Sequence, residues 1–225
     1  MSRVKAIFDA DILIHLVKTN AIDFAINTID YIYISEWVYE NEIKKTTAEG
    51  KTIKKLNNVG KIKILKYDKL TSHQKIVFKE TYKLLKDKNT STNHDDNFIN
   101  EGERSTASFA KALNIYYYMS DDNRAAPHIR SLAAIDIINY CDILFIYLYA
   151  YGNIAEKDKL EKCYQNYIKL YDANKIPKIL RNKDTTYTFI EIIGRCFSRF
   201  EQTPNLKKFL DDVKENINRK LAVDE

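Results

Sequence analysis

The chain has 225 residues, of which 45% are hydrophobic and 30% are charged, and its formal net charge is +5. This composition excludes an intrinsically disordered protein, and the mild positive charge permits a nucleic-acid partner without requiring one. Three cysteines without a CxxC spacing argue against a zinc site or a disulfide framework and favour a reducing compartment. The most apolar stretch, residues 137–152, contains Asp142 and is too short to cross a bilayer. We therefore expect a cytoplasmic protein that does not enter a membrane.

Short β-branched and aromatic runs alternate with stretches of helical spacing as far as residue 151. The predicted strands are residues 3–9, 31–35, 61–67, 115–120 and 135–139. The predicted helices between and after them are residues 21–30, 36–56, 70–86, 103–114 and 140–151. Residues 86–102 are polar and irregular, and we expect them to form a loop.

Alternating strands and helices indicate a parallel sheet covered by helices on both faces. The predicted fold class is therefore α/β, with three layers in an α/β/α order. Residues 153–225 show lysine-rich helical patterns and no convincing strand. We expect one domain over residues 1–152 and a helical C-terminal extension over residues 153–225. The apolar positions of the extension suit packing on that domain or on another chain, such as a second copy in a homo-oligomer.

Acidic residues follow two of the predicted strands. Asp9 comes directly after the run KAIF, and Asp121 and Asp122 come directly after the run IYYYMS. The carboxyl ends of parallel strands lie at one edge of the sheet, so these side chains converge if the two strands are neighbours. We assign Asp11 to the N-cap of the helix that it precedes rather than to the site.

Two predicted helices supply further acids. Glu103 opens the helix 103–114, whose alanine-rich face allows close packing on a sheet. Glu40 and Glu42 lie in the first turns of the helix that follows the second strand. Taken singly, each glutamate is also compatible with a structural role, as a solvated acid or as a first-turn partner of the helix dipole.

A cluster of converging carboxylates has a defined chemical consequence. Carboxylates that meet without compensating lysines repel one another, and a divalent cation neutralises them. Ligation by oxygen alone suits Mg²⁺ or Mn²⁺ rather than zinc. Such a cation at the edge of a sheet typically serves phosphate chemistry. The acids therefore predict a metal-dependent enzyme that acts on phosphate esters.

Four motifs, in order along residues 3–153, resemble the PIN-domain ribonucleases, the family of the VapC-type toxins. They are FDADILI, SEWVYENEI, GERSTASFAKAL and SDDNRAA, and the last has Ser120 as its hydroxyl residue and Arg124 nearby. The resemblance places acidic site residues at Asp9, at Glu40 or Glu42, at Glu103, and at Asp121 or Asp122. The usual family spacing falls on Asn41, between the two glutamates, so both remain candidates. Asp121 leaves the strand first, whereas the family spacing points at Asp122, and both are kept.

The resemblance implies a PIN-like, Rossmann-like fold and an endoribonuclease that depends on Mg²⁺ or Mn²⁺. It implies RNA as substrate, and it also implies an antitoxin protein as partner where the chain is the toxin of a toxin–antitoxin pair. In this reading Asp9, Glu103, Asp121 and Asp122 hold the metal, and Glu40 or Glu42 completes the catalytic set. Fourteen lysines stand between residues 44 and 88. They are either a solvated face or contacts to the RNA backbone that weaken with salt.

Two other functions fit parts of the pattern. DAD after a hydrophobic strand also resembles the Asp-x-Asp motif of haloacid dehalogenase-type phosphatases, in which the first aspartate is a nucleophile. The Gly-Thr that usually follows is missing, since the chain continues with ILI. The ambiguous second acid and the C-terminal extension depart from the compact PIN pattern. They favour a non-catalytic PIN-like module that binds RNA or protein.

Overall fold

The structure is a computed structural model that describes residues 4–91, 99–121, 126–152, 156–171, 176–182 and 185–223. These residues form two compact units. The sheet unit comprises Lys5–Ile14 and Ile29–Asn139. The helical unit comprises Val4, His15–Thr28 and the described residues from Tyr140 onward. The predicted domain boundary after residue 152 falls inside the helical unit.

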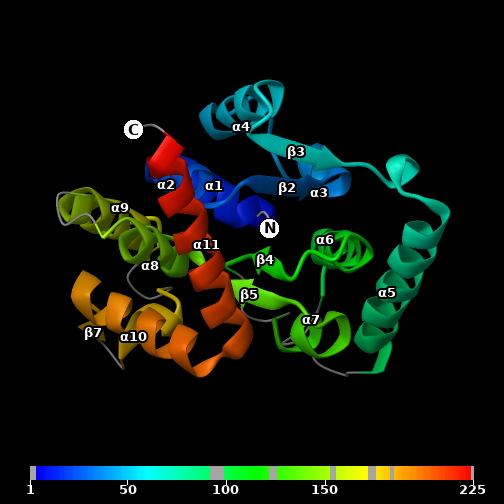
Figure 1. Ribbon diagram of the computed structural model, residues 1–225. Helices are drawn as coiled ribbons and strands as arrows, with labels where there is room; N and C mark the ends of the chain where they lie inside the picture. The colour runs from blue at the N-terminus through cyan, green and yellow to red at the C-terminus, as the bar shows by residue number, and fades with distance from the viewer. Residues whose placement is uncertain are drawn as a thin grey trace. The chain divides into compact units, whose positions relative to one another are not determined.

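The sheet unit contains five strands and most of the helices between them (Figure 1). Its strands are β1 (Lys5–Phe8), β2 (Tyr31–Ser35), β3 (Ile62–Leu65), β4 (Tyr117–Met119) and β5 (Asp136–Ile138). Its helices are α3 (Glu36–Asn41), α4 (Ala48–Asn58), η1 (Tyr67–Lys69), α5 (Ser72–Ser91), α6 (Glu101–Ala112) and α7 (Ala126–Ala133). Helix α1 (Ala10–Lys18) begins in this unit and ends in the helical unit.

All strand pairs in the sheet are parallel, and the strand order is β3-β2-β1-β4-β5. Phe8, the last residue of β1, is in register with Ile34 and with Met119 on its two neighbours. The carboxyl ends of β1, β2 and β4 therefore lie side by side. The predicted α/β class and parallel sheet are confirmed, with helices flanking the sheet, while the three-layer, PIN-like arrangement remains a prediction.

Helix α6 packs directly on the sheet, and α5 packs on α6 (Figure 1). Ala107 and Ala110 are fully buried, as the alanine-rich face predicted. They share one hydrophobic cluster with Ile7 of β1 and Tyr118 of β4. Alanine methyl groups let the helix axis approach the strands closely, so the first turn of α6 is brought to the carboxyl edge of the sheet.

Several predicted boundaries were wrong. The helix expected over residues 36–56 is two helices, because the chain turns after Asn41 and Thr47 caps α4 by accepting a hydrogen bond from the Gly50 amide at 3.1 Å. Helix α5 continues to Ser91, so the predicted loop is shorter than expected, and residues 92–98 lie outside the described part. Asp11 is not an N-cap, since α1 already begins at Ala10.

The helical unit is organised around the apolar helix α8 (Tyr140–Tyr151). Its other elements are α2 (Ile22–Thr28), α9 (Lys157–Ile168), η5 (Lys178–Leu180), α10 (Phe189–Gln202), α11 (Pro204–Val223) and a pair of two-residue strands. These strands, β6 (Arg181–Asn182) and β7 (Thr185–Thr186), correct the expectation of no strand after residue 153. None of the helices in the described part of the chain is both long and apolar enough to cross a membrane.

Candidate active site

Asp9 is buried at the carboxyl end of β1 and is held by three donors. Its Oδ1 accepts a hydrogen bond from the Ala10 amide at 2.8 Å. Its Oδ2 accepts one from the Tyr118 hydroxyl at 2.9 Å and a longer one from the Ser120 hydroxyl at 3.4 Å. Burial raises the pKa of Asp9 to about 6, although these donors favour the charged form. The side chain is therefore fixed in one orientation and costly to ionise.

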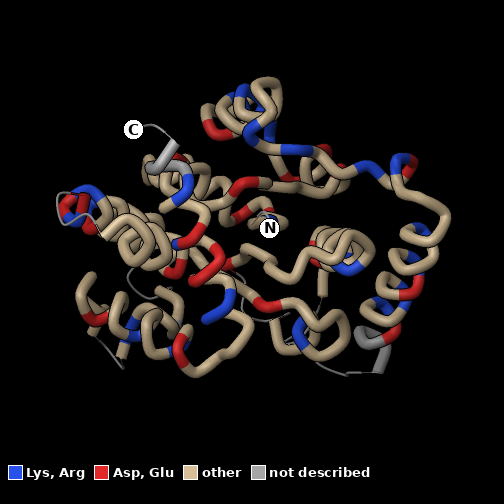
Figure 2. The backbone as a smooth tube through the Cα atoms, viewed as in Figure 1, with Lys and Arg blue, Asp and Glu red and all other residues tan. Residues whose placement is uncertain are grey.

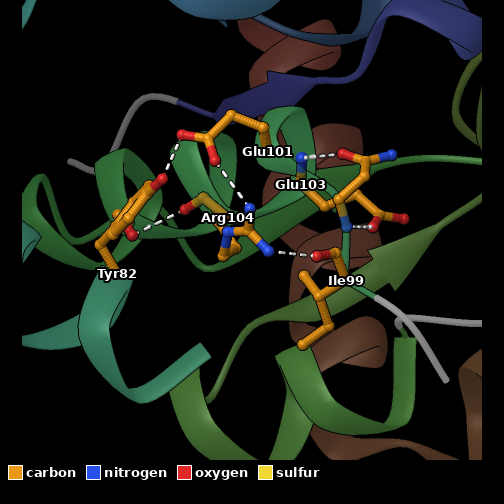
Figure 3. A network of polar contacts seen from close by, with 7 residues as sticks. Tyr82, Ile99, Glu101, Glu103 and Arg104 are labelled. Atoms are coloured by element: carbon orange, nitrogen blue, oxygen red, sulfur yellow. Dashed lines mark hydrogen bonds and ion pairs between the residues drawn. The ribbon is translucent and has the colours of Figure 1, made fainter. Parts of the chain in front are cut away.

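Glu103 is buried in the first turn of α6, with 2% of its surface exposed. It belongs to a capping box, in which Asn100 Oδ1 accepts a hydrogen bond from the Glu103 amide at 2.8 Å. In return, Glu103 Oε2 accepts one from the Asn100 amide at 2.7 Å (Figure 3). The sequence N-E-G-E is a capping-box signature, and it could have predicted that α6 begins at Glu101 rather than at Glu103.

Glu40 and Glu42 are placed in different environments. Glu40 is exposed on α3 and forms an ion pair with Lys45. Glu42 is half-buried, and its pKa is raised to about 7 by burial and then by the charges of Asp9, Asp11 and Glu103. Glu42, and not Glu40, therefore lies among the acids of the sheet edge.

The carboxyl group of Glu42 lies against Gly102 in the first turn of α6. A Cβ atom at residue 102 would stand 2.9 Å from Cδ of Glu42 and closer still to its Oε1 atom. Only glycine leaves room for this approach. Glycine therefore stands at residue 102 for a steric reason, because the carboxyl group of Glu42 occupies the space that a side chain would need.

Asp11, which we expected to be a helix N-cap, lies near the other acids. It is exposed in the first turn of α1, and its charge raises the pKa values of both Asp9 and Glu42. Only Ala10 separates it from Asp9, so it lies at the same edge of the sheet. We refer to Asp9, Asp11, Glu42 and Glu103 as the acidic cluster.

Of the two acids expected after β4, the structure describes only Asp121. Asp121 is half-buried and directly follows Ser120, whose hydroxyl reaches Asp9. It therefore lies at the same edge of the sheet. Asp122 lies outside the described residues, as does Arg124.

Within the described part of the chain, no group of three or more His, Cys, Asp or Glu side chains is arranged to hold a metal ion. Oxygen atoms of Asp9 and Glu103 instead accept hydrogen bonds from the protein itself. The donor set is nevertheless all carboxylate oxygen, which is the chemistry that Mg²⁺ and Mn²⁺ prefer.

Comparisons with known proteins bear on the family assignment. No protein-family model, curated protein or solved structure matches this chain. The resemblance to PIN-domain ribonucleases therefore rests on the four sequence motifs alone.

Proposed function

We propose that the chain is a divalent-metal-dependent endoribonuclease of the PIN type. The observation that carries the proposal is the acidic cluster at one edge of a parallel sheet. Three of its members, Asp9, Glu42 and Glu103, are buried or half-buried, and they come from segments far apart in the sequence. Burial, followed by the charges of Asp9, Asp11 and Glu103, raises the pKa of Glu42 to about 7. A fold gains no stability from burying these acids together, so a role in binding or catalysis accounts for the arrangement better.

The metal-holding residues in this proposal are Asp9 and Glu103, with Asp121 or Asp122 as a third acid. When bound, the cation would supply a Lewis acid for a phosphoryl oxygen. The chain itself orients the carboxylates, because Tyr118 and Ser120 hold Oδ2 of Asp9.

Glu42 has a different part in the proposed reaction. In the metal-free protein, burial and then the charges of the neighbouring acids raise the pKa of Glu42 to about 7, so this carboxylate holds a proton more readily than an ordinary glutamate. We assign to Glu42 the acceptance of a proton from the water that attacks the phosphodiester. The space over Gly102 leaves its carboxyl group beside the first turn of α6.

The lysines between residues 44 and 88 support RNA as the substrate. Figure 2 shows lysine and arginine along α4, β3 and α5, and β3 is one of the two edge strands of the sheet. Lys61 and Lys63 are exposed at this edge, and Lys63 Nζ lies 4.5 Å from the ring centroid of Tyr31. Lysines so placed would bind phosphates without reading sequence.

A test combines metal binding with cleavage of single-stranded RNA. Asp9→Asn and Glu103→Gln are expected to lose both Mn²⁺ binding, followed by electron paramagnetic resonance, and Mg²⁺-dependent cleavage. Glu42→Gln should retain Mn²⁺ binding but cleave about 10²–10⁴-fold more slowly, the range typical of a lost general base. Glu40→Gln is the matched control and should behave as the wild type. Cleavage that survives in all three site variants would refute the assignment.

A second candidate is a PIN-like module that binds RNA without cleaving it. The observation that favours it is that no described group of acids is arranged to hold a metal ion. This module would bind RNA equally well in EDTA and in Mg²⁺, and Asp9→Asn would leave that affinity unchanged.

A further inference from the structure

A network of polar contacts joins α5 to the start of α6 (Figure 3). The Tyr82 hydroxyl donates a hydrogen bond to Oε1 of Glu101. Arg104 Nη2 contacts the other carboxylate oxygen, Oε2, at 2.7 Å, and Nη1 donates to the carbonyl oxygen of Ile99 at 2.6 Å. The guanidinium carbon also lies 5.7 Å from the centroid of the Tyr82 ring. One arginine thus connects three points of the chain.

This network is partly buried, and Arg104 is better shielded from solvent than Glu101. The side chain of Arg104 is only 12% exposed, and its buried Nε atom has no hydrogen-bond partner among the described residues. Desolvation opposes the ionic attraction between Arg104 and Glu101, although on balance their contacts lower the pKa of Glu101 and raise that of Arg104. The network fixes the chain just before α6, because the side chain of Ile99 is fully buried and its carbonyl oxygen is held by the guanidinium.

The first turn of α6 is where the acidic cluster would otherwise relax. Helix ends fray easily, because their first amides lack partners within the helix. Glu103 lies in this turn, and its charge interacts with that of Glu42. Repulsion between the two would be relieved if the turn opened and Glu103 moved to solvent. The contacts of Arg104 to Ile99 and Glu101 span the cap residue and oppose this opening.

We infer that Tyr82, Glu101 and Arg104 are positioning residues that hold the carboxylate of Glu103 in the acidic cluster by fixing the first turn of α6. The inference rests on the proposed function, because it gives Glu103 a task that requires a fixed place. Partners of this kind behind a metal ligand typically contribute 10–100-fold to metal affinity or activity.

The test uses the full chain with two variants. Tyr82→Phe removes only the hydroxyl, and Arg104→Lys keeps the charge but loses the fork that reaches Ile99 and Glu101 together. Both should bind Mn²⁺ at least about tenfold more weakly. Without metal, the amides of Glu103 and Arg104, which donate hydrogen bonds to Asn100, should exchange with solvent at least about tenfold faster, while amides of the sheet strands should be unchanged. Arg195→Lys on α10, where the arginine covers the ring of Tyr187, is the matched control.

The outcomes separate the inference from the proposed function. If Glu103→Gln loses Mn²⁺ while both variants bind it as the wild type does, the positioning role is overturned and the metal site stands. If amide exchange of the first turn is unchanged in both variants, the positioning role is also overturned. If Glu103→Gln itself binds Mn²⁺ normally, the proposed metal site is refuted and the inference with it.

Discussion

Glu42→Gln is expected to stabilise the metal-free protein at alkaline pH and to leave its stability unchanged at acidic pH. The physical reason is the raised pKa of Glu42, caused by burial and by the neighbouring acids. Glutamine has nearly the same shape as protonated glutamate but cannot ionise. The substitution therefore removes the cost of the charge and little else.

The pH range and the size of the effect follow from proton linkage. The pKa of Glu42 is 4.5 in the unfolded chain and about 7 in the folded one, so the folded state binds the proton more tightly. The stability that this provides is complete below pH 4.5 and is lost as the pH rises through about 7. At about 1.4 kcal/mol for each tenfold change in proton affinity, the loss would reach about 3 kcal/mol. Solvent screens a half-exposed group, so we expect about 1–2 kcal/mol above pH 8.

The single tryptophan makes this measurable near the site. Trp37 lies on α3, the helix that precedes Glu42, so its fluorescence follows urea unfolding of the sheet unit. Unfolding midpoints of wild type and Glu42→Gln would be compared in EDTA at pH 4 and pH 8.5, with Glu40→Gln as control. If Glu42→Gln raises the stability by the same amount at both pH values, or if Glu40→Gln raises it as much, the explanation by ionisation is refuted.

Three further predictions concern other features. Gly102→Ala should displace the carboxyl group of Glu42 with little change in the thermal unfolding temperature, because that group is the end of a flexible side chain, whereas Gly194→Ala, with open space around its Cβ, should stabilise α10 by up to about 1 kcal/mol. The double change of Lys61 and Lys63 to Gln should weaken binding to single-stranded RNA. It should also reduce the slope of log affinity against log salt by about 1.4 in filter-binding assays. Asp142→Asn should cost about 3 kcal/mol in urea unfolding, because the buried carboxylate binds an arginine of α10.

The sheet could largely be predicted from the sequence. All five strands lie within the predicted ranges, because buried parallel strands produce apolar runs that are bounded by polar residues. The placement of Asp9 and Asp121 at one edge followed from the same pattern. The strand order was not predictable, since hydrophobicity does not say that β1 lies between β2 and β4. This adjacency brings Ser120 and Tyr118 to the carboxylate of Asp9.

The choice between Glu40 and Glu42 could not be made from the sequence. Residues 36–56 suit a continuous helix, in which the two glutamates differ only by a rotation about the axis. The structure separates them because α3 ends at Asn41, which leaves Glu42 at the helix end while Glu40 points to solvent and Lys45. Two local signals could have improved the prediction, namely Thr47 as an N-cap and the space that Gly102 provides.

Three acids of the cluster, Asp9, Glu42 and Glu103, are buried or half-buried, and each is held by a different local feature. Asp9 is held by the hydroxyl of Tyr118, Glu103 by the capping box, and Glu42 by the missing side chain at Gly102. The acids are nevertheless costly to keep charged, because burial first and neighbouring acids second raise the pKa values of Asp9 and Glu42. A chain under selection for stability alone would replace these acids by amides at little structural cost. Local order that maintains a globally unfavourable arrangement is the pattern expected of a functional site.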